Sequence, residues 1–153
     1  RLVDAGKSAQ EIAHGVEAVR DRVVVMGLLE TLEYLVRGGR LSAAAGAIGT
    51  LLSFKPVVAV EDGLVVQLGM ARGSKNGRNL LNQQVERAGG IDFDMPLALG
   101  YTGLDDKLLK KYIDDSHHLW AGHKESELPV HTIGATIGTH VGPGAVAVAF
   151  FAR

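Results

Sequence analysis

His140 is the residue of this chain whose type and setting point most directly to chemistry. It lies in Gly138-Thr139-His140-Val141-Gly142-Pro143-Gly144, just before the apolar run 145–151. Glycines let a backbone approach a ligand closely, and proline restricts the loop because it fixes one φ angle. We therefore predict a strand-end loop that aims the imidazole into a cleft. The alternative is a histidine in a glycine-rich turn that has no functional role.

Arg40 is a second candidate, because it stands between Gly38-Gly39 and Ser42, where one helix is expected to end and another to begin. A guanidinium is a planar donor suited to a carboxylate or a phosphate. The N–H groups of the following helix would point the same way. A solvated arginine after a glycine cap is the alternative interpretation. Lys55 fits a lysine whose stem covers apolar surface, and a functional cation at the edge of a pocket is the alternative there.

Three other clusters of polar residues are weaker candidates for a functional site. Arg72, Lys75 and Arg78 form a basic cluster at a helix start, where they oppose the helix dipole, so the cluster serves either a partner or phosphate, or is a solvated face. The stretch 69–75 has the wrong spacing for a phosphate-binding P-loop, and Asn76 follows its lysine. His117-His118 and His123 are expected on a polar helix face rather than around a metal ion, because adjacent helical side chains diverge by about 100°.

Hydrophobic spacing and turn residues predict the order α-β-α-α-β-β-α-β-α-β-β. Ser8 to Glu11 reads as a capping box, and Asp62-Gly63 as the turn of a hairpin. The predicted helices span 8–19, 28–35, 43–52, 74–88 and 105–120, and the predicted strands span 23–26, 57–60, 64–68, 97–101, 130–133 and 145–151.

One hairpin combined with a β-α-β crossover implies a mixed sheet with helices packed against it, an α/β (α+β) fold. The crossover strands should be parallel and their connection right-handed. A length of 153 residues suits one domain. The chain begins with Arg1 rather than Met, so we expect a fragment whose N-terminal part is missing; a processed or trimmed complete protein is the alternative.

Composition excludes several classes of function. The net charge of −1 gives no bulk attraction to nucleic acid. The absence of cysteine excludes disulfides, thiolate chemistry and cysteine-based zinc sites. No apolar run reaches the roughly 18–20 residues of a membrane span, so stable membrane insertion is not expected. We expect a cytoplasmic protein, since a reducing compartment is compatible with this composition.

Three segments in order resemble the C-terminal half of DegV proteins, a fatty-acid-binding family. They are residues 32–42, 51–57 and 137–144, and the capping-box helix and residues 70–73 also fit. The resemblance covers nearly the whole chain. It implies two α/β domains that bury an acyl chain between them, with residues 1–153 forming the C-terminal lipid-binding domain and the N-terminal domain absent.

The resemblance also implies a function. A DegV-like carrier would bind a long-chain fatty acid and present its carboxylate to a separate ATP-binding fatty acid kinase subunit, which makes an acyl phosphate. Such a carrier is not an enzyme itself, and it needs no metal or cofactor beyond the bound fatty acid. His140 matches the family histidine that hydrogen-bonds the carboxylate, Arg40 matches a position near it, and Thr139 and Gly142 are assigned to the same site. Arg72 would lie on a surface that meets the kinase.

Two rival functions remain open from the sequence. In the first, His140 is the nucleophile or general base of a phosphotransferase or hydrolase. That role needs a carboxylate to orient the imidazole, and no acidic residue lies within about ten positions of His140, although a distant one could fold close. The second rival is a regulatory interaction module with a vestigial cleft.

Overall fold

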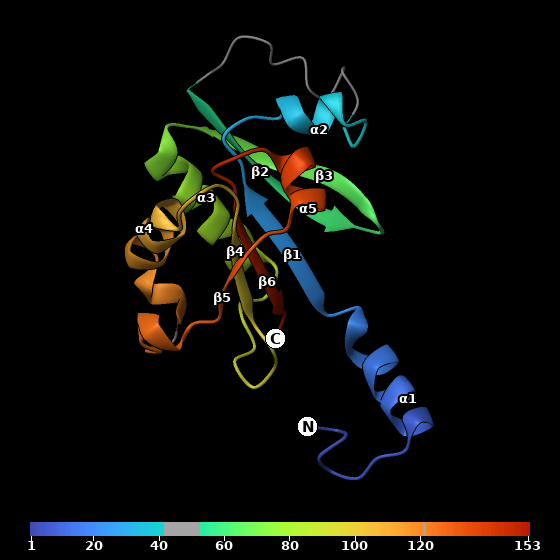
Figure 1. Cartoon of the computed structure of the whole chain (residues 1–153). Coiled ribbons are helices and arrows are strands. Elements are labelled where there is room, and N and C mark those ends of the chain that lie inside the picture. Colours follow the sequence, from blue (N-terminus) through green and yellow to red (C-terminus); the bar gives the residue numbers. More distant parts are fainter. Residues whose placement is uncertain (42–52, 121) are drawn as a thin grey trace.

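The computed structural model describes residues 1–41, 53–120 and 122–153 (Figure 1). A six-stranded sheet forms its centre. The helices are α1 (Ala9–Arg20), α2 (Glu33–Arg37), α3 (Ser74–Arg87), α4 (Lys107–Asp115) and α5 (Ala135–Val141), with short 3-10 helices η1 (His117–Trp120) and η2 (Glu125–Glu127). The strands are β1 (Val23–Leu28), β2 (Phe54–Glu61), β3 (Leu64–Arg72), β4 (Ala98–Tyr101), β5 (Val130–Thr132) and β6 (Val146–Phe151).

The strand order is β3-β2-β1-β6-β4-β5. Strands β4 and β5, joined through α4, pair in parallel, and the other neighbouring strands pair antiparallel. The predicted mixed sheet with packed helices is therefore confirmed, as is the parallel crossover pair. The predicted hairpin is also confirmed: Asp62 and Gly63 both have positive φ angles, of 49° and 78°, as a tight hairpin turn requires.

One face of the sheet is covered by α3 and α4, which lie together on one side in Figure 1. Leu81 and Val85 of α3 and Tyr112 of α4 are buried against strand residues that include Val148 and Phe150. Along β6, Val146, Val148 and Phe150 point to this face and alternate with Ala147 and Ala149, which point to the opposite one. This face holds the main hydrophobic core.

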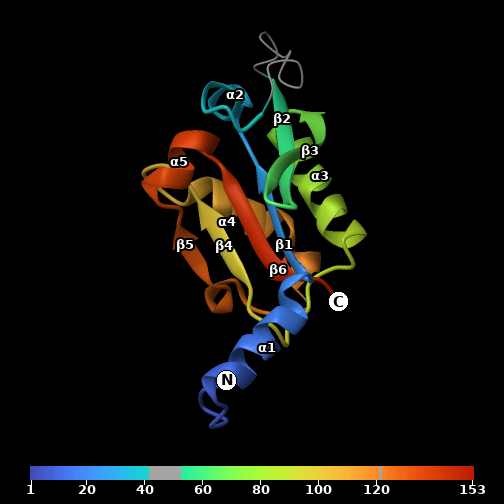
Figure 2. The ribbon, with the colours of Figure 1, turned by 90° about the vertical axis from the view of Figure 1, so that its right-hand side faces the viewer.

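The described residues cover the opposite face only in part. In the register, Val25 pairs with Ala149 and Gly27 with Ala147, so small and β-branched side chains line the middle of this face, and Phe151 beside Val23 lies towards its open end. Helices α2 and α5 cover one end of it, where they enclose a second apolar cluster. Figure 2 shows both helices at this end of the sheet. Towards the other end Val25 is 36% exposed and Val60 is 49% exposed. We call this surface the half-open face.

The structure corrects two of the predicted helices and leaves a third untested. The strand β1 continues to Leu28, so the helix predicted over 28–35 becomes the short α2, and Leu29 and Leu32 instead pack in the second cluster. The helix predicted over 105–120 divides at Ser116, a fully buried residue that accepts a hydrogen bond from Asn82 Nδ2 at 2.9 Å. The helix predicted over 43–52 lies outside the described residues.

Helix α1 is close to the prediction and has the predicted capping box, in which Ser8 and Glu11 satisfy each other's backbone N–H groups. None of its residues is buried, and it extends away from the sheet in both views (Figures 1 and 2). Across the described ranges, no helix combines the length and the apolar character that a membrane span requires.

Candidate functional site

His140 lies in the last turn of helix α5, so the prediction of a strand-end loop was wrong for this residue. The helix has only seven residues, among them Gly138 and four β-branched residues, and such a composition gives no helical signal in the sequence. The loop proper is Gly142-Pro143-Gly144, and both glycines have φ angles of 77–78°, which glycine adopts without strain.

Thr102, which directly follows β4, fastens this loop to the sheet. Its hydroxyl donates to the carbonyl oxygen of Gly142 at 2.6 Å and accepts the N–H of Ala145 at 2.9 Å. Its backbone N–H donates to Ala145 O at 3.0 Å, and its carbonyl accepts the N–H of Gly144 at 3.1 Å. Thr102 is buried, so these four bonds form away from competing water.

The imidazole of His140 packs against Gly38, the residue that ends α2. A methyl group at Gly38 would collide with Nδ1 of His140, so the ring occupies the space that any other residue at this position would fill. The Nδ1 atom is buried and has no hydrogen-bond partner within the part of the chain that the structure describes. The ring as a whole is half-buried, between the two extremes of full solvent exposure and enclosure in the core.

Tyr34 of α2 makes a second close approach, because its ring lies directly on Gly142. Any side chain at Gly142 would collide with this ring, and the positive φ angle independently favours glycine there. Helices α2 and α5 therefore meet at two glycine contacts, Gly38 with His140 and Gly142 with Tyr34. These contacts fix the imidazole at the covered end of the half-open face.

Arg40, in the turn that follows α2, reaches the same place. Its Nη1 atom donates to the carbonyl oxygen of Gly38 at 2.8 Å, and its backbone N–H donates to Leu35 O at 2.8 Å. Arg40 and His140 thus both contact one residue, Gly38, and the arginine is exposed to solvent. A guanidinium here adds positive charge near the imidazole, which suits an anionic ligand.

Thr139 is exposed, and its hydroxyl donates to the carbonyl oxygen of Ala135 at 2.8 Å on its own helix. That bond uses the proton and leaves the oxygen as an acceptor. Gly142, the fourth predicted residue, lies against Tyr34, and its carbonyl oxygen accepts the hydroxyl of Thr102. Tyr34 and Thr102 were not predicted from the sequence. Neither has a distinctive motif, since each acts through a contact between residues far apart in the chain.

Glu30 and Lys55 lie beside the same loop. Lys55 Nζ is 2.5 Å from Glu30 Oε2, and a Cβ at Gly144 would be 2.9 Å from Glu30 Cγ. The lysine side chain is mostly buried, at 12% exposure, while its ammonium reaches the exposed glutamate. Most of the Lys55 side chain is therefore buried, and its charged end is in an ion pair.

The predicted basic cluster divides into two parts. Arg78 is buried and binds Asp115 of α4, with Nε 2.7 Å and Nη2 2.6 Å from Oδ2, so it joins α3 to α4. Lys111 and this arginine together hold the pKa of Asp115 below its usual value. Arg72 and Lys75 are exposed, and the contact of Arg72 with a kinase stays a prediction.

The histidines predicted on a polar face lie around η1 and the loop after it. His118 is 3.8 Å from Glu86, and His123 is 4.0 Å from Glu127 and stacks on Phe93 with the ring centres 4.6 Å apart. Within residues 1–41, 53–120 and 122–153, no three or more potential ligands gather into a metal-binding group.

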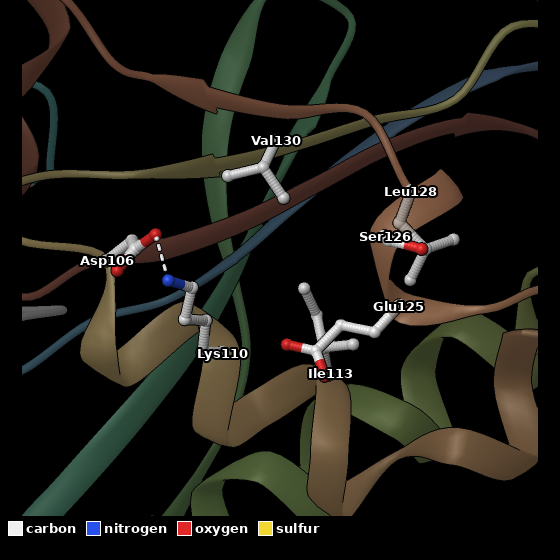
Figure 3. Close-up of a pocket in the computed structure, with 7 residues that line it drawn as sticks. All are labelled: Asp106, Lys110, Ile113, Glu125, Ser126, Leu128 and Val130. Atoms are coloured by element: carbon white, nitrogen blue, oxygen red, sulfur yellow. Dashed lines mark ion pairs between the residues drawn. The ribbon is translucent and has the colours of Figure 1, made fainter.

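A pocket of about 570 Å³ lies elsewhere, between α4, η2 and the edge strand β5 (Figure 3). Ile113, Leu128 and Val130 supply its apolar lining. Lys110 and Asp106 form an ion pair of 3.0 Å at its side, and this contact raises the pKa of Lys110. The pocket shares no residue with the cluster of His140, Gly38, Tyr34 and Thr102, so it is a separate feature.

The cluster at His140 offers a donor or acceptor nitrogen beside an apolar surface. The rival catalytic role would require a carboxylate that orients the imidazole through Nδ1, and no such partner lies among the described residues. What the geometry supplies is one polar anchoring point, near Arg40, at the end of an apolar surface that includes Val25, Ala147 and Ala149.

Residues 1–153 match a family model described as "Uncharacterised protein, DegV family". A DegV domain-containing protein of Clostridium perfringens is 31% identical over 149 residues, which cover 96% of this chain and 51% of that protein. The chain thus spans about half the length of the curated relatives it matches.

Solved structures share the fold. A DegV family protein of Thermus thermophilus, described by its fatty acid binding, is 27% identical with a TM-score of 0.76, covering 99% of this chain and 53% of that chain. The Streptococcus pneumoniae Fatty Acid Kinase (Fak) B3 protein loaded with linoleic acid is 18% identical with a TM-score of 0.82, covering 99% of this chain and 52% of that chain.

Proposed function

The chain belongs to the DegV family, and from this premise we propose that it binds a long-chain fatty acid. The carboxylate binds at His140, and the acyl chain lies along the half-open face of the sheet. The observation that carries the proposal is the place of His140: a half-buried imidazole, fixed by Gly38 and by the Thr102 loop, at the covered end of an apolar surface.

The half-open face has the side chains that an acyl chain needs. Val25, Ala147 and Ala149 leave room beside the sheet because they are small, whereas the face under α3 and α4 is filled by large residues. Burial of a palmitate-length tail contributes on the order of 11 kcal/mol before costs, at about 0.8 kcal/mol per methylene. Immobilisation and ordering remove much of this. The apolar surface therefore supplies affinity, while the polar end sets orientation.

The carboxylate end needs polar partners, because a buried carboxylate without them is costly. The buried Nδ1 of His140 faces Gly38, so we assign the contact with the carboxylate to Nε2. Arg40 adds positive charge next to Gly38, and Thr139 and Gly142 complete the surroundings of the imidazole. Hydroxyl groups outside this chain, from the half that the longer relatives have in addition, would supply further donors.

We extend the proposal to the biological role. The protein is a cytoplasmic carrier rather than an enzyme, and it presents the carboxylate to a separate ATP-binding fatty acid kinase subunit for acyl-phosphate formation. The support is membership of the family, together with the likeness in fold to the fatty acid kinase B3 protein. An imidazole at the carboxylate leaves one oxygen open to an incoming phosphoryl group, which suits presentation.

The direct test is mass spectrometry of lipids extracted from the purified protein. We expect long-chain fatty acid near one equivalent, and a strong loss in His140→Ala. His117→Ala is the matched control, because His117 is exposed on η1 and far along the chain from the site. If no fatty acid copurifies and added fatty acid does not bind, or if the two variants retain equal amounts, the proposal is wrong.

A further inference from the structure

We propose that Thr102 is a positioning residue for the fatty-acid carboxylate, and that it acts by holding His140 with Nε2 towards the ligand. The inference rests on the proposed function and assigns a role to a residue outside every motif of the sequence. Thr102 does not touch the ligand in this account. It sets the place of helix α5, on which the imidazole stands.

The four hydrogen bonds of Thr102 enclose the loop that ends α5. Its hydroxyl bridges Gly142 O and Ala145 N–H, at 2.6 and 2.9 Å, and its backbone bonds Gly144 and Ala145. The loop between those residues contains two glycines with positive φ angles and has little stiffness of its own beyond Pro143. Thr102, at the end of β4, therefore holds the C-terminal end of α5 in place.

His140 lies two residues before Gly142, whose carbonyl oxygen the hydroxyl of Thr102 holds. The methyl group of Thr102 also faces α5, since a Cβ at Gly138 would be 3.9 Å from Cγ2. With α5 held this way, Nδ1 is pressed against Gly38 and is left without a partner among the described residues. A buried N–H without an acceptor is costly, so the neutral ring should carry its proton on Nε2, ready to donate to a carboxylate.

The test compares Thr102→Val with Thr102→Ser. Valine keeps the shape and removes the hydroxyl, so Gly142 O and Ala145 N–H both lose their partner, whereas serine keeps both bonds. We expect valine to weaken binding of palmitate about tenfold or more, the factor for one hydrogen bond to a charged group. We expect serine to restore binding to within about threefold of the unmodified protein.

The matched control is Thr132→Val on β5, which removes a hydroxyl that donates to Tyr101 Oη at 3.0 Å on the same sheet but makes no contact with the loop. Its palmitate affinity should be unchanged. The second readout is the imidazole ¹⁵N and ¹³C NMR spectrum of His140. We expect the Nε2–H tautomer in the unmodified protein, in Thr102→Ser and in Thr132→Val. In Thr102→Val we expect a mixture of the Nε2–H and Nδ1–H tautomers, or a shifted imidazole signal.

The unmodified protein provides a measurement that does not depend on a variant folding. If Thr102 positions the ligand-binding helix, added palmitate should slow hydrogen exchange at the Ala145 amide, which donates to Thr102 Oγ1. Equal affinity in Thr102→Val, the Nδ1–H tautomer in the unmodified protein, or no change in exchange at Ala145 on saturation would each overturn the proposal. Absence of palmitate binding by the unmodified protein would instead reject the proposed function.

Discussion

The two faces of the sheet are built in opposite ways. On the face under α3 and α4, large side chains such as Leu81, Tyr112 and Phe150 fill the space and are nearly inaccessible to water. On the half-open face, Val25 and Ala149 are small, and among the residues that the structure describes only α2 and α5 cover it, at the end near His140. The same six strands therefore provide a stable core on one side and, in our account, a surface for an acyl chain on the other.

The two faces thus have different roles: one stabilises the fold, and in our account the other binds the fatty acid. Close packing stabilises a fold because filled cores gain contacts and leave no cavities. A ligand-binding surface must do without part of that gain, since the ligand replaces side chains. Substitutions on the two faces should consequently have opposite profiles: large changes in unfolding free energy under α3 and α4, and changes in fatty-acid affinity on the half-open face.

Phe150→Ala should have the largest effect on stability. Phe150 is 1% exposed within the main core, so truncation leaves a cavity and lowers the free energy of unfolding by about 3–5 kcal/mol. Urea denaturation followed by circular dichroism measures this loss. The molecules that remain folded should bind palmitate with near-normal affinity. A loss below about 1 kcal/mol would contradict the assignment of this face as the stabilising core.

Gly142→Ala tests the junction between α2 and α5. The added methyl group meets the Tyr34 ring at a positive φ angle, so stability should fall by about 2–4 kcal/mol and fatty-acid binding should also be lost. Calorimetry of unfolding and of palmitate binding measure the two effects. The double variant with Tyr34→Ala should recover part of the stability. No recovery would show that the two residues do not meet.

Ala149→Leu should distinguish the two faces most clearly, because we expect it to change palmitate affinity far more than stability. Ala149 pairs with Val25 on the half-open face, and its neighbour Phe150 points to the core. A larger side chain there should change the unfolding free energy by less than about 1 kcal/mol, because the site is not tightly packed, yet occupy space meant for the acyl chain. We expect palmitate affinity to fall at least about tenfold, a change of about 1.4 kcal/mol. Normal affinity would place the acyl chain elsewhere.

The smallest predicted effect concerns pH. Lys111 and Arg78 lower the pKa of Asp115 in the folded protein, so the ion pair stabilises the fold above the ordinary carboxyl pKa of about 3.9. That stability should be lost as pH falls from this value through the lower folded pKa. Asp115→Asn should be less stable at pH 7 and show a flatter decline in acid. Thermal unfolding between pH 2 and 7 checks this, and parallel curves would contradict it.

Much of the fold could be predicted from local pattern. The capping box at Ser8 and the Asp62-Gly63 turn are short-range signals, and both are confirmed. The helix α5 could not be found this way, because Gly138 and its β-branched neighbours have low helix propensity and the helix exists through contacts with α2 and Thr102. Tertiary contacts, rather than local helix propensity, therefore make α5 a helix.

The candidate site was predictable only in part. His140 and Arg40 were singled out from their motifs, and the structure brings both to Gly38. Tyr34 and Thr102 were missed, because their contacts with Gly142 join positions 108 and 40 residues apart, and no spacing rule encodes such contacts. The roles of His140, Arg40, Thr139 and Gly142 in fatty-acid binding stay predictions.

The most direct test is a crystal structure of the protein saturated with palmitate. Our account predicts a forked head of density within hydrogen-bond distance of His140 Nε2 and a continuous tail along Val25, Ala147 and Ala149. An acyl chain in the pocket beside α4 and β5 (Figure 3), or an empty half-open face at saturating palmitate, would contradict it.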